Sequence, residues 1–364
     1  MVVAAHVLAV VLGGAIVFGT VLSAVATFVV PRGVPARLTR LVFQTSRRLF
    51  DVRVKAARTY EAGESVMAWY APLTLLLLVA AWLVLLIAGF TFVFRGLGVP
   101  TWALAIETSG SSLTTLGFVP VHGLGRQLVA FAEAGLGLLL LALLITYLPT
   151  IYGAFQRREQ LVTRAAMQAG SPPSGVNLLV RFHQISGFGA LDAQVWQPWV
   201  AGLVDIEESH TSLASLPFFR SPRPDRHWVT SLGAVLDAAS LRASTLDLPR
   251  EPSAELCIRT GFLALRHIGD FYGIGYDPDP QRGDPISITR DEWEEARQAL
   301  GDAGVPLRDD IDEAWLDFCG WRVNYDSVLL VLAGLVMAPY APWISDRGST
   351  RRHRPPLRRR RVAS

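Results

Sequence analysis

The sequence predicts an all-α membrane protein with three transmembrane helices, a re-entrant loop and a mostly helical cytoplasmic domain. Three runs contain no Asp, Glu, Lys or Arg: 7–31, 65–94 and 134–156, of 25, 30 and 23 residues. A helix needs about 20 apolar residues to cross the hydrocarbon core of a bilayer. The connection between the last two runs is apolar and rich in hydroxyl groups, and the composition becomes that of a soluble domain after Gln156. These observations exclude a purely soluble or secreted protein.

The first run predicts a transmembrane helix at about 2–30 and not a signal peptide. It has no basic n-region, and the apolar run is about twice the 7–15 residues of a signal-peptide h-region. The sequence Pro31-Arg32-Gly33 ends it.

The distribution of basic residues predicts the orientation of the chain. Eight basic residues and one acid lie between Arg32 and Arg58, three arginines closely follow the third run, and 96–125 contains no Lys or Arg. By the positive-inside rule, the N-terminus lies outside and the C-terminus in the cytoplasm of a multi-pass plasma-membrane protein. The linker 32–64 is typical of an amphipathic helix on the inner leaflet, where it would meet anionic lipids. A solvated connecting helix remains an equal alternative for this linker.

The connection 100–121 predicts a re-entrant loop. Its first part, Trp102 to Ile106, is apolar and favours a short helix, and a small, hydroxyl-rich part follows. The segment is too short to span a membrane and too apolar to lie in water. Irregular backbone survives at membrane depth only where it is buried in protein or lines a wet cavity.

The segment Ser112-Leu113-Thr114-Thr115-Leu116-Gly117-Phe118 resembles the pore loop of the potassium-channel superfamily, in its bacterial two-transmembrane form. The filter of that family is of the Thr-Val-Gly-Tyr-Gly type, and its backbone carbonyls, from four subunits, replace the hydration shell of the ion. The resemblance implies that Thr115, Leu116, Gly117 and Phe118 form an ion-conduction filter. It also implies that the Phe118 ring packs sideways against the pore helix and that Thr114 caps the end of that helix.

Two residues depart from the family pattern. Val119 stands at the second filter glycine and Pro120 at the Asp that usually follows. A β-branched residue resists positive φ, and the proline restricts Val119 further toward extended conformations. The outermost ion site is therefore expected to lack its usual geometry. Either ions still bind deeper in the filter with reduced potassium selectivity, or the filter has collapsed.

These observations together divide the chain into five parts. These are an extra N-terminal transmembrane helix (1–31), the basic linker (32–64), a pore domain (65–156), a cytoplasmic helical domain (157–346) and a disordered Arg-rich tail (347–364). Within the pore domain we expect an outer helix at 66–95, the pore helix and filter at 101–120, and an inner helix at 127–153. The inner helix is expected to run on to about Ala169, before Gly170-Ser171-Pro172-Pro173.

Three residues of the inner helix are candidates for a gating hinge. Gly135 and Gly137 lie near mid-membrane, where glycine weakens a helix by about 1 kcal/mol relative to Ala. Pro149 would kink the helix near its cytoplasmic end. Close helix packing through small residues explains the two glycines equally well.

Two carboxylates are unusual because they lie in segments that are predicted to be within the membrane. Glu133 is the only acid within the predicted inner helix, and Glu107 lies in the predicted pore helix. A charge at such depth costs about 2.5–3.5 kcal/mol on insertion scales, so each should face a partner or water. Both are candidates for supporting the filter from behind, although the sequence does not say which residues they pair with.

The last half of the chain predicts a helical domain without recognisable chemistry. Thr289 to Glu292 has the form of a capping box before a helix that ends near Gly301. No His-x-x-x-His spacing, paired CxxC motif, P-loop or catalytic constellation occurs. We therefore expect no catalytic residues, no metal site, no cofactor and no enzymatic activity. Seven arginines within 351–361 favour attraction to anionic lipids rather than nucleic acid.

These features together predict a homotetrameric, potassium-channel-like cation channel, with K⁺ or another monovalent cation as the permeant ion. Its cytoplasmic domain would regulate the gate. The alternative is a non-conducting membrane receptor or scaffold that keeps a degenerate pore fold.

Overall fold

The computed structural model describes the chain except for residues 1, 29, 31–36, 57–59 and 348–364. Residues 348–364 of the predicted Arg-rich tail and residues 32–36 and 57–59 of the predicted basic linker therefore lie outside the described residues. Throughout the described residues the secondary structure is helical, and one isolated β-bridge pairs Leu246 with Leu307. The chain divides into a first unit, Met1–Asp51 with Trp69–Tyr152, and a second unit, Val52–Ala68 with Gly153–Ser364.

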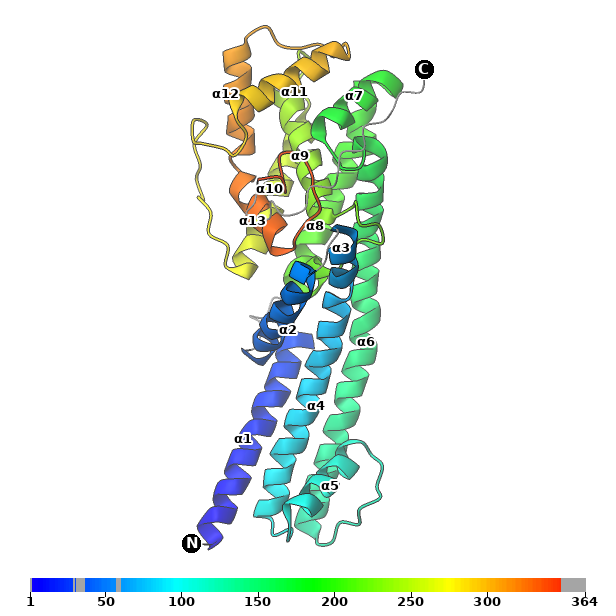
Figure 1. Cartoon of the computed structure of the whole chain (residues 1–364), viewed down its shortest axis with the longest axis vertical. Coiled ribbons are helices and arrows are strands. Elements are labelled where there is room, and N and C mark those ends of the chain that lie inside the picture. The colour runs from blue at the N-terminus through cyan, green and yellow to red at the C-terminus, as the bar shows by residue number, and fades with distance from the viewer. Residues whose placement is uncertain (1, 29, 31–36, 57–59, 348–364) are drawn as a thin grey trace. The chain divides into compact units, whose positions relative to one another are not determined.

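Three helical stretches are long and apolar enough to cross a membrane: Val3–Phe28, Ala62–Gly96 and Leu124–Ala169. This confirms the predicted all-helical class with three apolar spans. The corresponding elements are α1 (Val2–Phe28), α4 (Tyr70–Gly96) and α6 (Leu124–Ala169) (Figure 1). As predicted, α6 continues to Ala169.

Helix α4 begins later than the predicted residue 66. A separate short helix, α3 (Tyr60–Ala68), precedes it, and a turn at Trp69 divides the two. Pro72 gives the physical reason, because its ring has no N–H and clashes with the carbonyl four residues earlier in a continuous helix.

Glycines allow α1 and α4 to pack closely along the first unit. A Cβ atom on Gly13 would lie 2.4 Å from the carbonyl oxygen of Gly89, and one on Gly96 would lie 2.4 Å from Val10. Helix α2 (Arg37–Ala56) is attached to α1 through a 2.8 Å hydrogen bond between the Thr27 and Thr39 hydroxyls. Small residues thus replace large ones where backbones approach, as is usual between apolar helices.

The second unit has its own hydrophobic core around α9 (Trp228–Ser244), which is buried on nearly every side. A helix surrounded in this way carries small and apolar residues around its whole circumference. The neighbouring helices are α7 (Gly175–Ile185), α8 (Gln197–Ser212), α10 (Pro252–Tyr272), α11 (Arg290–Asp302), α12 (Ile311–Arg322) and α13 (Asp326–Leu335). The predicted capping box at Thr289 and Glu292 is confirmed at the start of α11.

Candidate functional site

The candidate site is the short helix α5 (Trp102–Leu113) with the ten residues that connect it to α6. Thr101 begins the helix, because its hydroxyl accepts a 3.1 Å hydrogen bond from the N–H of Leu104. Thr114 ends it as the C-cap, and its hydroxyl donates to the carbonyl of Gly110 at 2.5 Å. The helix therefore ends where the hydroxyl-rich sequence begins.

Beyond α5 the backbone folds back onto the last turn of the helix. The N–H groups of Leu116 and Gly117 donate to the carbonyl of Ser111 at 3.0 and 3.4 Å, and the N–H of Thr115 donates to Ser112 at 3.0 Å. The N–H of Val119 donates to the Ser111 hydroxyl at 3.3 Å. Ser111 therefore receives three of the four N–H groups that fix this turn.

These donors determine where the carbonyl groups point. In a trans peptide, the C=O of one residue is antiparallel to the N–H of the next. The N–H groups of residues 115, 116, 117 and 119 point at α5, so the carbonyls of Thr114, Thr115, Leu116 and Phe118 point away from it. Among the described residues, no donor reaches these carbonyls. We call these four groups the carbonyl row.

The turn requires left-handed backbone at two positions. Thr115 has φ of 57° and Gly117 has φ of 67°. Glycine adopts this region freely, whereas a β-branched threonine there is an outlier that its surroundings must hold in place. Val119 is not left-handed, in agreement with its β-branched side chain and the proline that follows.

Side chains along the carbonyl row are exposed within one chain. Leu116 is 70% exposed and Phe118 is 64% exposed. The Phe118 ring was predicted to pack against the short helix, and within a single chain most of its surface is left uncovered. Pro120 is also exposed.

The two unusual carboxylates lie apart. Glu133 on α6 is fully buried, and one of its oxygens lies 2.5 Å from the hydroxyl of Ser109 on α5. The same hydroxyl lies 3.2 Å from the carbonyl of Ile87 on α4, so this cluster joins three helices. The second oxygen of Glu133 is buried with no partner among the described residues. Glu107 is exposed and does not join this cluster.

The two candidate hinge glycines have different surroundings. A Cβ atom on Gly137 would lie 2.1 Å from the carbonyl oxygen of Leu113, at the end of α5. Nothing lies within 4 Å of the corresponding position on Gly135. Gly137 therefore permits the close approach of α6 to α5, whereas Gly135 does not pack within one chain. Pro149 lies inside the continuous helix α6.

Residues that the sequence analysis did not single out support this arrangement. Ser109 and Ser111 make the contacts described above, and Arg126 donates to the carbonyls of Leu97 and Gly98 at 3.0 Å each. The two serines lie in a hydroxyl-rich run of the sequence. The spacing within that run does not show which residues line the loop and which support it from behind.

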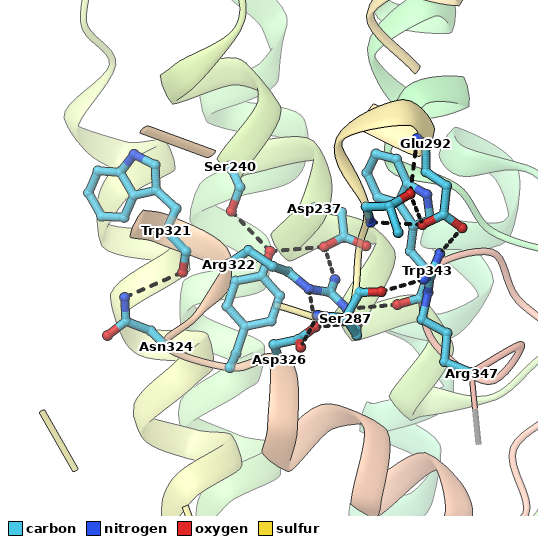
Figure 2. Close-up of polar contacts among 12 residues, drawn as sticks. Asp237, Ser240, Ser287, Glu292, Trp321, Arg322, Asn324, Asp326, Trp343 and Arg347 are labelled. Carbon is cyan, nitrogen blue, oxygen red and sulfur yellow. Dashed lines mark hydrogen bonds and ion pairs between the residues drawn. The ribbon is translucent and has the colours of Figure 1, made fainter. Parts of the chain in front are cut away.

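The second unit contains a buried ionic network (Figure 2). The guanidinium of Arg322 on α12 bonds to Asp237 on α9, to Asp326 at 2.7 Å and to the carbonyl of Trp343 at 2.7 Å. The Tyr325 hydroxyl donates to Asp237 at 2.9 Å. Burial alone would lower the pKa of Arg322, but the two carboxylates outweigh it and raise the pKa. Each of the three guanidinium nitrogens has a partner, so the network ties α12 to α9 and to the segment around Trp343.

Within the part of the chain that the structure describes, no group of three or more His, Cys, Asp and Glu side chains is placed to hold a metal ion. Comparison of the chain with protein-family models, with curated proteins and with solved structures finds no match.

Proposed function

We propose that the chain is one subunit of a homotetrameric, potassium-channel-like cation channel whose carbonyl row lines the path of the ion. The observation that carries the proposal is the direction of the peptide groups in residues 114–119. The N–H groups of residues 115, 116, 117 and 119 are occupied by the end of α5, and the four carbonyls of the row are directed away from it without donors among the described residues. Carbonyl oxygens that have no protein donor are the ligands with which such filters replace the hydration shell of an ion.

The direction of α5 supports the proposal electrostatically. The C-terminal end of a helix carries a partial negative charge of roughly half an elementary charge. The carbonyl row directly follows this end, at Thr114. A cation beside the row would therefore be stabilised both by the four carbonyls and by the helix end behind them.

One copy of the row cannot enclose an ion, so the proposal requires several copies around an axis, about four as in the resembling family. The first unit has apolar surface for such contacts. Phe131 and Leu138 on α6 are 69% and 57% exposed in the single chain. In the assembled protein we expect neighbouring copies and lipid to cover these side chains.

In the proposed arrangement, residues 100–121 form a re-entrant loop entered from outside the cell, and residues 157–346 are cytoplasmic. Helix α2 would then lie on the inner leaflet of the plasma membrane. Its Leu41 and Leu49 are 59% and 64% exposed, with arginines on both sides of this stripe. An apolar stripe flanked by basic residues is the pattern that binds an anionic bilayer surface.

The test is ion flux through the purified chain in liposomes, with potassium, sodium and barium, together with its subunit count by native mass spectrometry. We expect four copies and cation flux. Gly117→Val should abolish the flux, because valine resists the φ of 67°. Val119→Gly should change the ratio of potassium to sodium flux.

Gly14→Ala on α1 is the matched control, because a Cβ atom at that position meets nothing within 4 Å in the chain. A monomeric protein would contradict the proposal. So would a tetramer without flux under every gating condition, which is the result expected of a non-conducting receptor or scaffold.

A further inference from the structure

In the second unit, the loop between α8 and α9, residues 213–227, is fastened to α6 through one buried arginine. Arg158 is 1% exposed. It donates to the carbonyls of Leu216 and Phe219 at 3.0 and 2.8 Å, and to Glu159 through two nitrogens at 2.9 and 3.2 Å. These bonds use four of the five N–H groups of the guanidinium.

The fifth N–H group of Arg158 points to His210 on α8. Nη1 of the arginine lies 3.5 Å from Nε2 of the histidine, which is fully buried. Arginine has no acceptor and stays protonated, so Nε2 must offer its lone pair. The single ring proton then lies on Nδ1, 3.2 Å from the Ser209 hydroxyl. This arrangement requires a neutral His210.

A second buried histidine, His227, is held neutral by a different contact. It is the N-cap of α9, and its Nδ1 accepts from the N–H of Val229 at 3.3 Å. The ring proton is therefore on Nε2, which is buried without a partner among the described residues. Adding a proton to Nδ1 would remove the cap.

Trp228 lies between the two imidazoles. Its ring centroid is 4.6 Å from that of His210 and 6.2 Å from that of His227. Its indole N–H donates to the carbonyl of Pro217 in the loop at 3.1 Å. The histidines, the tryptophan and the loop therefore form one packed group.

We propose that His210 and His227 form an acid-sensitive latch that holds the α8–α9 loop on α6. Protonation of His210 would direct an N–H group at the guanidinium of Arg158, and protonation of His227 would remove the cap of α9. Each event replaces a hydrogen bond by a buried positive charge next to arginine. The loop would then leave α6 between Phe155 and Thr163, where the Phe219 ring and Arg226 now contact it.

The surrounding charges favour the neutral histidines. Burial, followed by Arg158, lowers the pKa of His210 well below its usual value, and burial, followed by Arg220 and Arg158, lowers that of His227. The nearby anions already have cationic partners, since Glu159 pairs with Arg158 and Glu64 of α3 with Arg220. The remaining ion pairs on α8 lie at more exposed positions and join Asp205 to Arg157 and Glu207 to His267.

The sign of the pH effect follows from these lowered pKa values. The released loop would have histidines that protonate near the ordinary value of about 6.5, whereas the latched form resists protonation. The latch is therefore complete above about pH 6.5 and weakens as the pH falls. The equilibrium should shift toward release by about tenfold per pH unit for each histidine.

Hydrogen exchange of the full chain in lipid nanodiscs tests the latch, with labelling times scaled for the intrinsic effect of pH. Between pH 7 and pH 5, peptides covering 213–227 should lose at least about tenfold protection. The variant His210→Gln/His227→Asn should keep its protection, because asparagine caps a helix without titrating. His267→Gln, at an exposed ion pair on α10, is the matched control and should respond like the natural sequence.

Unchanged protection of the natural sequence at pH 5 would overturn the proposal, as would an equal loss in the double variant. Circular dichroism at pH 7 checks that the variant folds, and His227→Asn alone should show a reduced pH response if the double variant does not fold. Any role of the latch in gating rests on the proposed channel function. The exchange experiment tests the latch whether or not the protein conducts ions. If the protein conducts ions but its hydrogen exchange does not depend on pH, only the latch proposal is wrong. If it does not conduct ions but its exchange depends on pH, only the channel proposal is wrong.

Discussion

The two units of this chain differ in how much of their apolar and charged side chains they bury. The second unit buries four tryptophans, its central helix α9 and even the charged Arg322 within its own core. In the first unit, only 22% of the most apolar stretch of α1 is buried. The second unit encloses a large hydrophobic core of its own. The first unit leaves its apolar surface to be covered by lipid and, in our proposal, by further copies.

The largest effect should come from breaking the closed network of the second unit. Arg322→Ala would leave Asp237 and Asp326 buried without their cation, which typically costs about 3–5 kcal/mol. Thermal unfolding of the chain measures this loss. Arg290→Ala, which removes exposed pairs with Glu294 and Asp312, is the control and should cost less than about 1 kcal/mol. Equal losses in the two variants would mean that the network is not part of the core.

The next largest effect should come from the closest helix contact at the candidate site. Gly137→Ala places a methyl group 2.1 Å from the Leu113 carbonyl, and overpacking of this kind costs typically about 1–3 kcal/mol or more. We expect a lower unfolding temperature in detergent and reduced ion flux in liposomes. Gly14→Ala on α1, where a Cβ atom meets nothing within 4 Å, should be close to neutral in both measurements. If the two variants behaved alike, α6 would not pack on α5 as the structure has it.

A smaller effect should follow from the buried carboxyl of the first unit. Ser109→Ala removes the side-chain partner that Glu133 has among the described residues and should cost about 1–3 kcal/mol, because it leaves a buried polar group unsatisfied. Ser109→Ala/Glu133→Leu removes both partners and should recover most of the loss. Thermal unfolding of the single and double variants measures the coupling, and strictly additive losses would argue against the contact.

The smallest effect should come from a helix end on the surface of the second unit. Thr289→Ala removes the hydroxyl of the capping box on α11 and should cost about 0.5–2 kcal/mol. Thr289→Ser keeps the hydroxyl and should restore the unfolding temperature. Failure of serine to do so would show that the threonine methyl group, and not the cap, carries the effect.

The sequence predicted the elements whose signals are local. Charge-free runs located the three apolar spans, and the spacing of Thr289 and Glu292 located the start of α11. The helix break before Pro72 was missed, because an apolar run continues through it. The π-helix at Asp192–Trp196 was also missed, since the regular spacing of the following residues favours an uninterrupted α-helix.

Only the part of the candidate site that has a local signal could be predicted from the sequence. Gly117 and the hydroxyl run carry a local signal, but Glu133 meets Ser109 across 24 residues. Arg322 meets Asp237 across 85 residues, and Arg158 meets His210 across 52. Such partners depend on how helices pack, and no spacing along the chain distinguishes them from other polar residues.

The turn after α5 is fixed mainly through peptide groups, since Ser111 receives the Leu116 and Gly117 N–H groups on its own carbonyl oxygen. Exchange of the Leu116 side chain leaves those bonds in place. Substitutions of Leu116 during evolution are therefore expected to leave the main-chain conformation of the turn unchanged. Codon changes at Leu116 and Phe118 should accordingly be tolerated more readily than a change at Gly117.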